Sequence, residues 1–264
     1  MNPSLDTSKS NSIKVQARVI WALIMREIIT RYGRHNVGFL WLFIEPMMFS
    51  IGITILWSFT GMSKGIIPVA GFALTGYSAI VLWRNMVGRL ANTSSANKGL
   101  LYHSQVKILD LILSRAFLEA AGISISFIFL SFAFTAVGLI SLPIDPLKTV
   151  LAWALLIWFA IAAGMIAAYA GETSEVFDRV WHVLMYLTLP FTGAFSMVSW
   201  LPPTVQEILL WSPMVHAVEM LREGYFGGEV NAIYSVFYLM SCNLVLTFVG
   251  LVLTRKIRRN LEES

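Results

Sequence analysis

Residues 149–171 read TVLAWALLIWFAIAAGMIAAYAG and contain no charged side chain. A helix of about 20 apolar residues is long enough to cross the hydrocarbon core of a bilayer. Because every backbone N–H and C=O in that core must be paired within the protein, an apolar run of this length predicts a membrane-spanning helix. This stretch favours an all-α integral membrane protein.

Five more segments are comparably apolar. They are Val37–Phe59, Ile66–Trp83, Ala120–Leu142, Val180–Val198 and Ala232–Thr254. The second is short, and we expect it to extend toward Leu90, because arginine side chains near a helix end can reach the headgroups. The fifth contains Pro190 and Gly193, which predict a kink or a break. Together with Thr149–Gly171 they predict six transmembrane helices.

The overall composition agrees with a membrane protein. Of 264 residues, 57% are apolar and 13% are charged, whereas soluble domains carry about 25% charged residues. This excludes an ordinary soluble enzyme, a disordered chain and a collagen-like chain. The net charge of +4 is too small to indicate nucleic-acid binding. The only cysteine, Cys242, is expected to be an inert thiol, and no cleavable signal peptide is expected.

The positions of lysine and arginine predict the orientation. Sixteen of the 19 lie in segments 1–36, 84–119, 172–179 and 255–264. The positive-inside rule therefore places both termini in the cytoplasm. The predicted organisation is an N-terminal segment 1–36, a six-helix domain 37–254 with a cytoplasmic loop 84–119 and an external segment 199–231, and a tail 255–264.

Apolar residues recur at helical spacing in the N-terminal segment. They are Ile13, Ala17, Ile20, Trp21, Ile24 and Ile28. Lys14, Arg18 and Arg26 lie off this stripe. The pattern favours an amphipathic helix on the cytoplasmic membrane surface. A plain basic flank of the first span is the alternative.

Few residues offer catalytic chemistry. The chain has no G-x-x-x-x-G-K-[ST] phosphate loop, so we do not expect it to hydrolyse nucleotide itself. No Ser-His-Asp or Cys-His set is recognisable. His216, Glu219 and Glu223 share a helical face and could bind a metal, but three ligands without a fourth favour a polar cluster with Arg222. We expect no catalytic residue, bound metal or bound cofactor.

One carboxylate interrupts the first span. Glu45 costs about 2.5–3.5 kcal/mol in the bilayer core, so it must face the bundle interior, a partner helix or water. Pro46 follows and bends the helix there. Pairing with a basic group near the interface is the alternative interpretation.

Small residues are spaced by four along the fourth span. They form two rows, Ala160, Gly164 and Ala168, and Ala163, Ala167 and Gly171. This spacing predicts a face on which a neighbouring helix packs closely.

Several stretches resemble the permeases of capsule-polysaccharide exporters, which are ABC-2 class transporters. They are 31–46 (RYGRHNVGFLWLFIEP), 97–110 (NKGLLYHSQVKILD), 114–120 (SRAFLEA) and 211–223 (WSPMVHAVEMLRE). The likeness runs from about residue 16 to the end, in the same six-span layout. Lys98 and Ile108 stand where the family often has glutamine and proline.

The resemblance implies a type V exporter-like fold, with an N-terminal amphipathic interface helix, in a bacterial inner membrane. It implies a homodimer that binds two separate ABC ATPase subunits, which hold ATP and Mg²⁺. The residues expected to engage the ATPase are Asn97, Lys98, Gly99, Leu100, Lys107 and Asp110.

The resemblance also implies a cargo, which is a lipid-linked, anionic capsular polysaccharide. Residues expected along its path are Arg31, Arg34, Phe39, Trp41, Phe43 and Glu45. Arg84 and Arg89 are further candidate attractors for an anionic glycan, unless they are ordinary positive-inside flanks. Membrane lipids, a periplasmic co-polymerase and outer-membrane export proteins are expected partners, and nucleic acid is not.

Two alternatives stay open from the sequence. An ABC-2 permease for an O-antigen or teichoic-type glycan, a lipid or a drug would have the same fold. A membrane-embedded enzyme or an ion-coupled carrier would need titratable groups on several spans. Only Glu45 and His182 meet that condition, which disfavours the second alternative.

Overall fold

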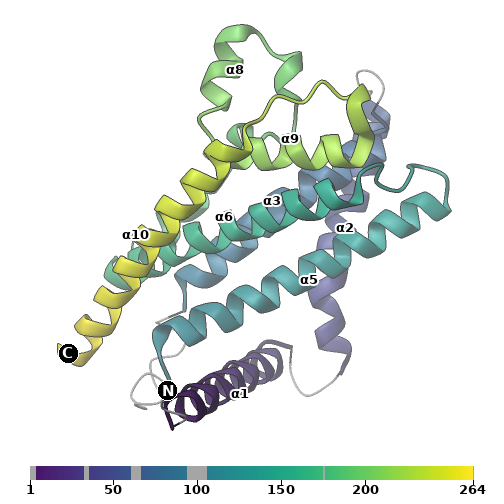
Figure 1. The fold of residues 1–264 in the computed structure, drawn as a ribbon. Coiled ribbons are helices and arrows are strands. Elements are labelled where there is room, and N and C mark those ends of the chain that lie inside the picture. Colours follow the sequence, from purple (N-terminus) through teal and green to yellow (C-terminus); the bar gives the residue numbers. More distant parts are fainter. Residues whose placement is uncertain (1–3, 33–35, 61–66, 94–105, 175, 264) are drawn as a thin grey trace.

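The computed structural model describes residues 4–32, 36–60, 67–93, 106–174 and 176–263, and every regular element in these ranges is helical. The elements are α1 (Ser4–Tyr32), α2 (Asn36–Thr60), α3 (Val69–Ala91), α5 (Ile108–Ala136), α6 (Pro146–Thr173), α7 (Phe177–Thr188), η2 (Leu189–Thr192), η3 (Val198–Trp200), α8 (Pro203–Leu209), α9 (Pro213–Phe226), η4 (Gly227–Glu229) and α10 (Val236–Glu263). Both termini lie at one end of the bundle of long helices, opposite α8 and α9 (Figure 1).

Helices coincide with all six predicted spans. Among the described residues, α5, α6 and Val236–Ile257 of α10 are long and apolar enough to cross a membrane. The apolar stretches Phe43–Phe59 of α2 and Val183–Thr192 of α7 and η2 are shorter. α3 covers the second predicted span and continues to Ala91, as expected.

The fifth predicted span is broken, as Pro190 and Gly193 indicated. α7 ends at Thr188, one 3-10 turn follows, and Gly193 then adopts a φ of +71°. A left-handed φ suits glycine and stops a helix. The prediction of a span reaching Val198 was therefore wrong in its last part, because the chain after Gly193 leaves the helical path.

Other boundaries also differ from the prediction. α5 begins at Ile108, well before Ala120, so helix occupies much of the predicted loop 84–119. α10 begins at Val236 rather than Ala232, and it continues through the basic tail to Glu263. Short helices occupy most of segment 199–231, which is predicted to be external, and the resemblance implied such helices.

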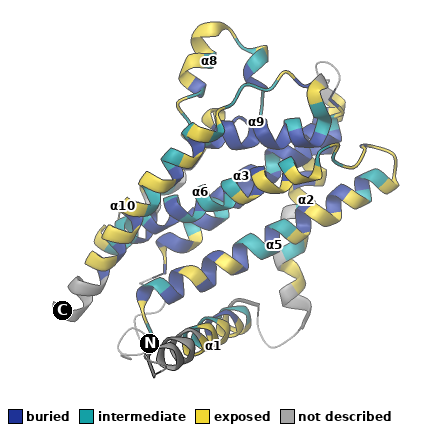
Figure 2. Ribbon diagram, viewed as in Figure 1, coloured by how far each residue is buried: buried dark blue, intermediate teal, exposed yellow. Residues whose placement is uncertain are grey.

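The core lies between α3 and α6. Leu74, Leu82 and Met86 of α3 are fully buried, and Figure 2 shows α3 as one of the most buried long helices. A side chain added at Gly164 would overlap Leu90, and one at Gly171 would overlap the Ala91 carbonyl. This close approach confirms the packing face predicted from the small residues of the fourth span.

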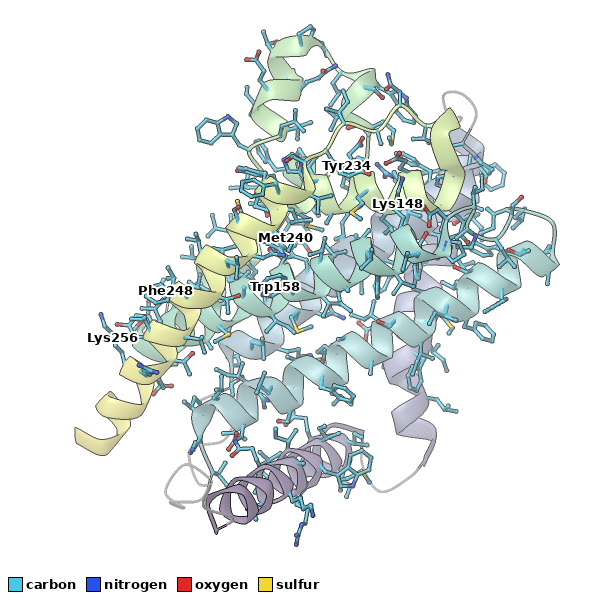
Figure 3. The ribbon with its side chains drawn as sticks, viewed as in Figure 1. Lys148, Trp158, Tyr234, Met240, Phe248 and Lys256 are labelled. Carbon is cyan, nitrogen blue, oxygen red and sulfur yellow. The ribbon has the colours of Figure 1, made fainter. Side chains whose placement is uncertain are left out.

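Hydrogen bonds fix α10 against α6. Trp158 Nε1 donates to Thr247 Oγ1 (2.9 Å), and Asn243 Nδ2 donates to the Leu155 carbonyl (3.0 Å). Such interhelical bonds stabilise helix pairs modestly in an apolar environment. Phe248 lies on the exposed side of α10 (Figure 3), so that side is available to lipid.

α1 packs along α5 and α2 with one part of the predicted stripe. Ile24 is buried with Leu118, and Ile20, Ile28 and Phe43 pack around them. A helix over the N-terminal segment is therefore confirmed, and one of its faces packs on the bundle; its position at the membrane surface stays a prediction.

Trp21, from the same predicted stripe, does not face the bundle. Trp21 is 63% exposed and lies with the exposed side chains Met25 and Ile29. α1 thus has two apolar faces, one on the bundle and one uncovered. A second uncovered apolar face suits a helix at a membrane surface.

We predict that Gly171→Ala destabilises the bundle by about 1–3 kcal/mol, because the new methyl group would overlap a backbone carbonyl that cannot rotate aside. Thermal unfolding of the detergent-purified chain measures this. Gly52→Ala is the control, since a methyl group there meets nothing within 4 Å. Equal unfolding midpoints for the two variants would contradict the close approach of α3 and α6.

Candidate functional site

The residues expected along the cargo path begin on α2. Trp41 is 53% exposed, Glu45 is half-buried, and Phe43 packs inward against α1 and α5. Arg34 lies outside the described residues. Arg31 belongs to the last turn of α1 and Phe39 to the first part of α2, but their side chains are not described.

A cluster of aromatic and charged side chains continues this surface onto α3 and α7. The Phe49 ring lies 6.1 Å from the Tyr77 ring, and the Arg84 guanidinium lies 5.9 Å from the centre of Phe49. Glu45, Arg84 and Tyr186 are all within electrostatic range of the Tyr77 hydroxyl. We call Glu45, Phe49, Tyr77, Arg84 and Tyr186 the aromatic–arginine cluster.

This cluster combines two kinds of recognition chemistry. Aromatic faces pack against the apolar faces of other rings, and an arginine can pair with a carboxylate or phosphate in bidentate fashion. Phe49 is 45% exposed and Tyr186 is 71% exposed, so a ligand could reach both. Tyr77 and Tyr186 were not identified as candidate site residues from the sequence. The spacing of Tyr77 and Arg84, two helical turns apart, is a signal that could have suggested a shared face.

The residues expected to engage the ATPase are divided by the structure. Asn97, Lys98, Gly99 and Leu100 lie outside the described residues. Lys107 is exposed at the start of α5. Asp110 is buried, and it accepts hydrogen bonds from the Lys107 backbone N–H (3.2 Å) and from Gln16 of α1. Asp110 therefore holds α1 against the first turn of α5.

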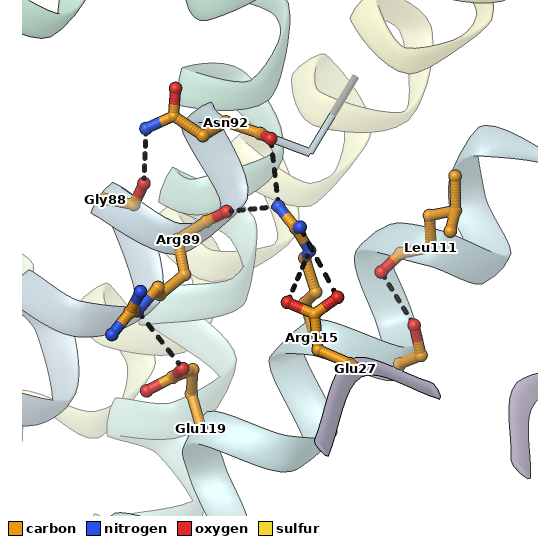
Figure 4. A network of polar contacts seen from close by, with 8 residues as sticks. Glu27, Gly88, Arg89, Asn92, Leu111, Arg115 and Glu119 are labelled. Atoms are coloured by element: carbon orange, nitrogen blue, oxygen red, sulfur yellow. Dashed lines mark hydrogen bonds and ion pairs between the residues drawn. The ribbon is translucent and has the colours of Figure 1, made fainter. Parts of the chain in front are cut away.

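A buried arginine joins three helices beside that turn. Arg115 of α5 pairs with Glu27 of α1 through Nε (3.1 Å) and Nη2 (3.4 Å). Its Nη1 donates to the carbonyls of Arg89 (3.2 Å) and Asn92 (2.9 Å), at the end of α3 (Figure 4). Helix carbonyls without an intrahelical partner attract a cation. Arg115 therefore ties the end of α3 to α1.

A second ion pair lies one turn further along α5. Glu119 is buried and lies 3.6 Å from Nε of Arg89, whose own side chain is half-exposed. Sequence reasoning missed Glu27, Arg115 and Glu119 as a set. The available signal was two opposite charges spaced by four on α5, Arg115 and Glu119, next to an apolar span.

At the opposite end of the bundle, the possible metal ligands of α9 have other partners. His216 Nδ1 accepts from the Ser235 N–H (2.9 Å), and its Nε2 lies 2.8 Å from the Leu210 carbonyl. Burial lowers the pKa of His216, which agrees with a neutral ring. No cluster of metal ligands occurs in the described part of the chain. These two contacts place His216 in the polar cluster that the sequence favoured.

Two acids of α9 complete this cluster. Glu219 is fully buried and accepts from the backbone N–H groups of Val198 (3.1 Å) and Ile233 (3.0 Å). Glu223 pairs with Lys148 (3.2 Å) and accepts from the Tyr234 hydroxyl. Figure 3 shows Lys148 and Tyr234 at this end. Burial, and then the bond to Glu223, raise the pKa of Tyr234 to about 12.

We predict that Arg115→Ala destabilises the chain by about 3–5 kcal/mol, because it breaks the ion pair of the mostly buried Glu27 carboxylate. Glu27→Ala should cost less, since Arg115 keeps two carbonyl partners. Unfolding of the purified variants and of the double variant measures both costs and their coupling. Arg18→Ala, at an exposed position of α1, is the control. Strictly additive costs for the pair would contradict the junction.

Comparison with known proteins agrees with the fold. The family model described as "ABC-2 type transporter" matches residues 18–226. The chain is 42% identical over 257 residues to the capsule polysaccharide export inner-membrane protein CtrC of Neisseria meningitidis serogroup B, and 41% identical over 257 residues to BexB of Haemophilus influenzae, which has the same description. Each alignment covers 97% of both chains.

A more distant relative agrees. The polysialic acid transport protein KpsM of Escherichia coli is 30% identical over 248 residues, covering 93% of this chain and 95% of its own. The family model covers most of the chain, and these relatives match it almost end to end. The chain belongs to the ABC-2 type transporter family.

Proposed function

We propose that the chain is the membrane-spanning subunit of an ATP-driven exporter that moves capsular polysaccharide across a bacterial inner membrane. The observation that carries this proposal is the 40–42% identity, over 97% of the chain, to inner-membrane proteins of capsule polysaccharide export. The sequence contains no nucleotide-binding phosphate loop, so hydrolysis would come from a separate ABC ATPase subunit.

The active unit is a homodimer in this proposal. α2 packs on its own chain through a narrow face that includes Ser50, Thr54 and Trp57. Most of its remaining surface is exposed and apolar, including Met48 and Ile55. α7 is also largely exposed on one side. A second copy covering parts of α2 and α7 would enclose a path between the two subunits.

The aromatic–arginine cluster supports a glycan as the cargo of that path. Tyr77 and Phe49 supply faces on which sugar rings could pack. Arg84 supplies a positive charge for an anionic sugar or a lipid-linked phosphate. Arg31, Arg34, Phe39, Trp41 and Glu45 would lie toward the cytoplasmic mouth of this path.

Coupling to the ATPase is proposed at the end of the bundle that holds both termini. Asn97, Lys98, Gly99, Leu100 and the exposed Lys107 would contact the ATPase in the cytoplasm. Asp110 and Arg115 support a route inward, because they connect the elements on both sides of that loop to α1. A push on the loop would then move α1 and the end of α3 together.

We predict that the chain, together with its ABC ATPase, restores surface capsule in a capsule-producing strain that lacks its own export permease. Surface polysaccharide and polysaccharide retained in the cytoplasm are both measured. An ATPase variant that cannot hydrolyse ATP is the control, and it should leave the polymer inside the cell. Export of a different glycan or of a lipid, with capsule still retained, would favour another ABC-2 cargo.

We predict that Tyr77→Leu and Arg84→Ala each lower capsule export about tenfold, because loss of a stacking or charged contact costs roughly 1–3 kcal/mol of cargo binding. Tyr77→Phe should keep most of the activity, since the ring stays. Glu45→Ala should also impair export more than membrane insertion. The measurement is surface capsule relative to the amount of permease in the membrane.

The matched control for these variants is Phe248→Leu, which changes an exposed aromatic residue on the outer side of α10. Normal export by Tyr77→Leu and Arg84→Ala would remove the cluster from the cargo path.

A further inference from the structure

α7 (Phe177–Thr188) is held very differently at its two ends. One end continues through η2 to Gly193, whose carbonyl accepts a hydrogen bond from the buried side chain of Arg222. The other end, which starts at Phe177, meets α3 through aromatic rings. The first end lies beside α9, because Arg222 of that helix binds the Gly193 carbonyl.

Arg222 of α9 binds the backbone of the segment that follows η2. Its Nη1 donates to the carbonyls of Gly193 (2.7 Å) and Ser196 (3.1 Å), and its Nη2 donates to the carbonyl of Ala194 (2.6 Å). The guanidinium also lies 3.9 Å from the centre of the Phe72 ring on α3. Arg222 is fully buried, and charge-assisted hydrogen bonds are strong at low local dielectric. This segment is therefore held firmly.

The helix that carries Arg222 is itself fixed to α6. The Asp145 N–H donates to the Gly224 carbonyl (2.9 Å), and the Ile144 N–H donates to the Tyr225 carbonyl (3.2 Å). Glu219, one turn before Arg222, accepts a hydrogen bond from the Val198 N–H, just after the residues that Arg222 binds. The chain from Gly193 to Val198 therefore belongs to one rigid unit with α6 and α9.

The side chains that the structure describes at the Phe177 end make fewer polar contacts. The Trp181 ring packs edge to face on the Trp83 ring, with 5.6 Å between the ring centres. It also stacks on the Phe177 ring of its own helix, with 5.9 Å between the centres. Among the α7 side chains that the structure describes, none makes a hydrogen bond or ion pair with another helix. The buried Trp181 Nε1 has no partner among the described residues. A buried donor without a partner is uncommon, and ring contacts can slide without breaking directional bonds.

No other part of the described chain covers the outer side of α7. Val183, Tyr186 and Leu187 are 59%, 71% and 64% exposed. We propose that α7 is a lever that pivots about residues 193–196, and that Arg222 is the positioning residue that fixes the pivot. Movement of the Phe177 end slides Trp181 along α3 and carries Tyr186 toward or away from Tyr77 and Arg84. The lever rests on the proposed export function and adds a moving part to it.

Two spin-label distances test the pivot directly. In a Cys242→Ala background, Leu151→Cys on α6 is the fixed reference, paired with Val183→Cys in one protein and Phe191→Cys in another; all three positions are exposed. Labelled copies are mixed with excess unlabelled copies, assembled with the ABC ATPase, and measured with and without a non-hydrolysable ATP analogue.

The lever predicts that nucleotide shifts the Val183–Leu151 distance and leaves the Phe191–Leu151 distance unchanged. Equal shifts at both positions would show that α7 moves as a rigid body and would overturn the pivot. No shift at either position, in a complex that still exports capsule, would also overturn it while leaving the export function intact. Failure of the unlabelled complex to export any capsule would instead defeat the proposed function.

Arg222 variants test the positioning role separately. Arg222→Gln removes the charged hydrogen bonds to residues 193–196, so we expect nucleotide to shift the Phe191–Leu151 distance in this variant. We also expect export to fall about tenfold or more, consistent with the strength of charged hydrogen bonds. ATP hydrolysis by the complex should stay within about twofold, because the ATPase end is untouched. Arg222→Lys, which keeps a charged donor, should recover part of the export. A parallel loss of protein amount, hydrolysis and export in both variants would assign Arg222 a structural role only, and the distance measurement on the wild-type pivot would still decide the lever.

Discussion

The constraint that shapes this molecule is the pairing of backbone polar groups away from water. Long helices satisfy it along their length, but each helix end leaves carbonyls or N–H groups without a partner. Here buried side chains supply the missing partners. Arg115 binds carbonyls at the end of α3, and Arg222 binds those that follow η2. Glu219 supplies the acceptor for N–H groups nearby. Charges that look costly in an apolar chain therefore hold its helix ends in place.

These buried charges give the two ends of the bundle different properties. At the end with both termini, Arg115 and Asp110 connect α1 to α3 and α5, beside the proposed ATPase contact. At the other end, α9 binds both the segment that follows η2 and the residues just before α6. Between them, α2 and α7 expose surfaces that no other helix of the described chain covers completely. A force applied at the end with both termini would therefore act on a stiff bundle in which the described side chains of α7 make few polar contacts with other helices. Such a structure suits a subunit that an external ATPase drives.

The class of fold could be predicted because it depends on long, uncharged runs such as Thr149–Gly171. The spacing of small residues correctly predicted a close-packing face on α6, and the structure shows that α3 packs there. Pro190 and Gly193 identified the break in the fifth span, but the path after Gly193 depends on Arg222, which lies far along the sequence. Trp21 was grouped with Ile20 and Ile24 in one stripe, because a periodic pattern does not show which apolar residues of a helix meet protein. The junction around Arg115 was missed for a related reason: this residue of α5 finds its partners on two other helices, α1 and α3.

The central claim is that the end of the bundle with both termini faces the cytoplasm, where an ATPase can reach it. Labelling of single cysteines with a membrane-impermeant maleimide tests this most directly, with Lys107→Cys and Trp211→Cys compared in a Cys242→Ala background. In intact spheroplasts the cysteine at position 211 should react, whereas the one at 107 should react only after the membrane is permeabilised. Reaction of position 107 from the outside of intact cells would contradict the account, because no cytoplasmic ATPase could then contact the loop.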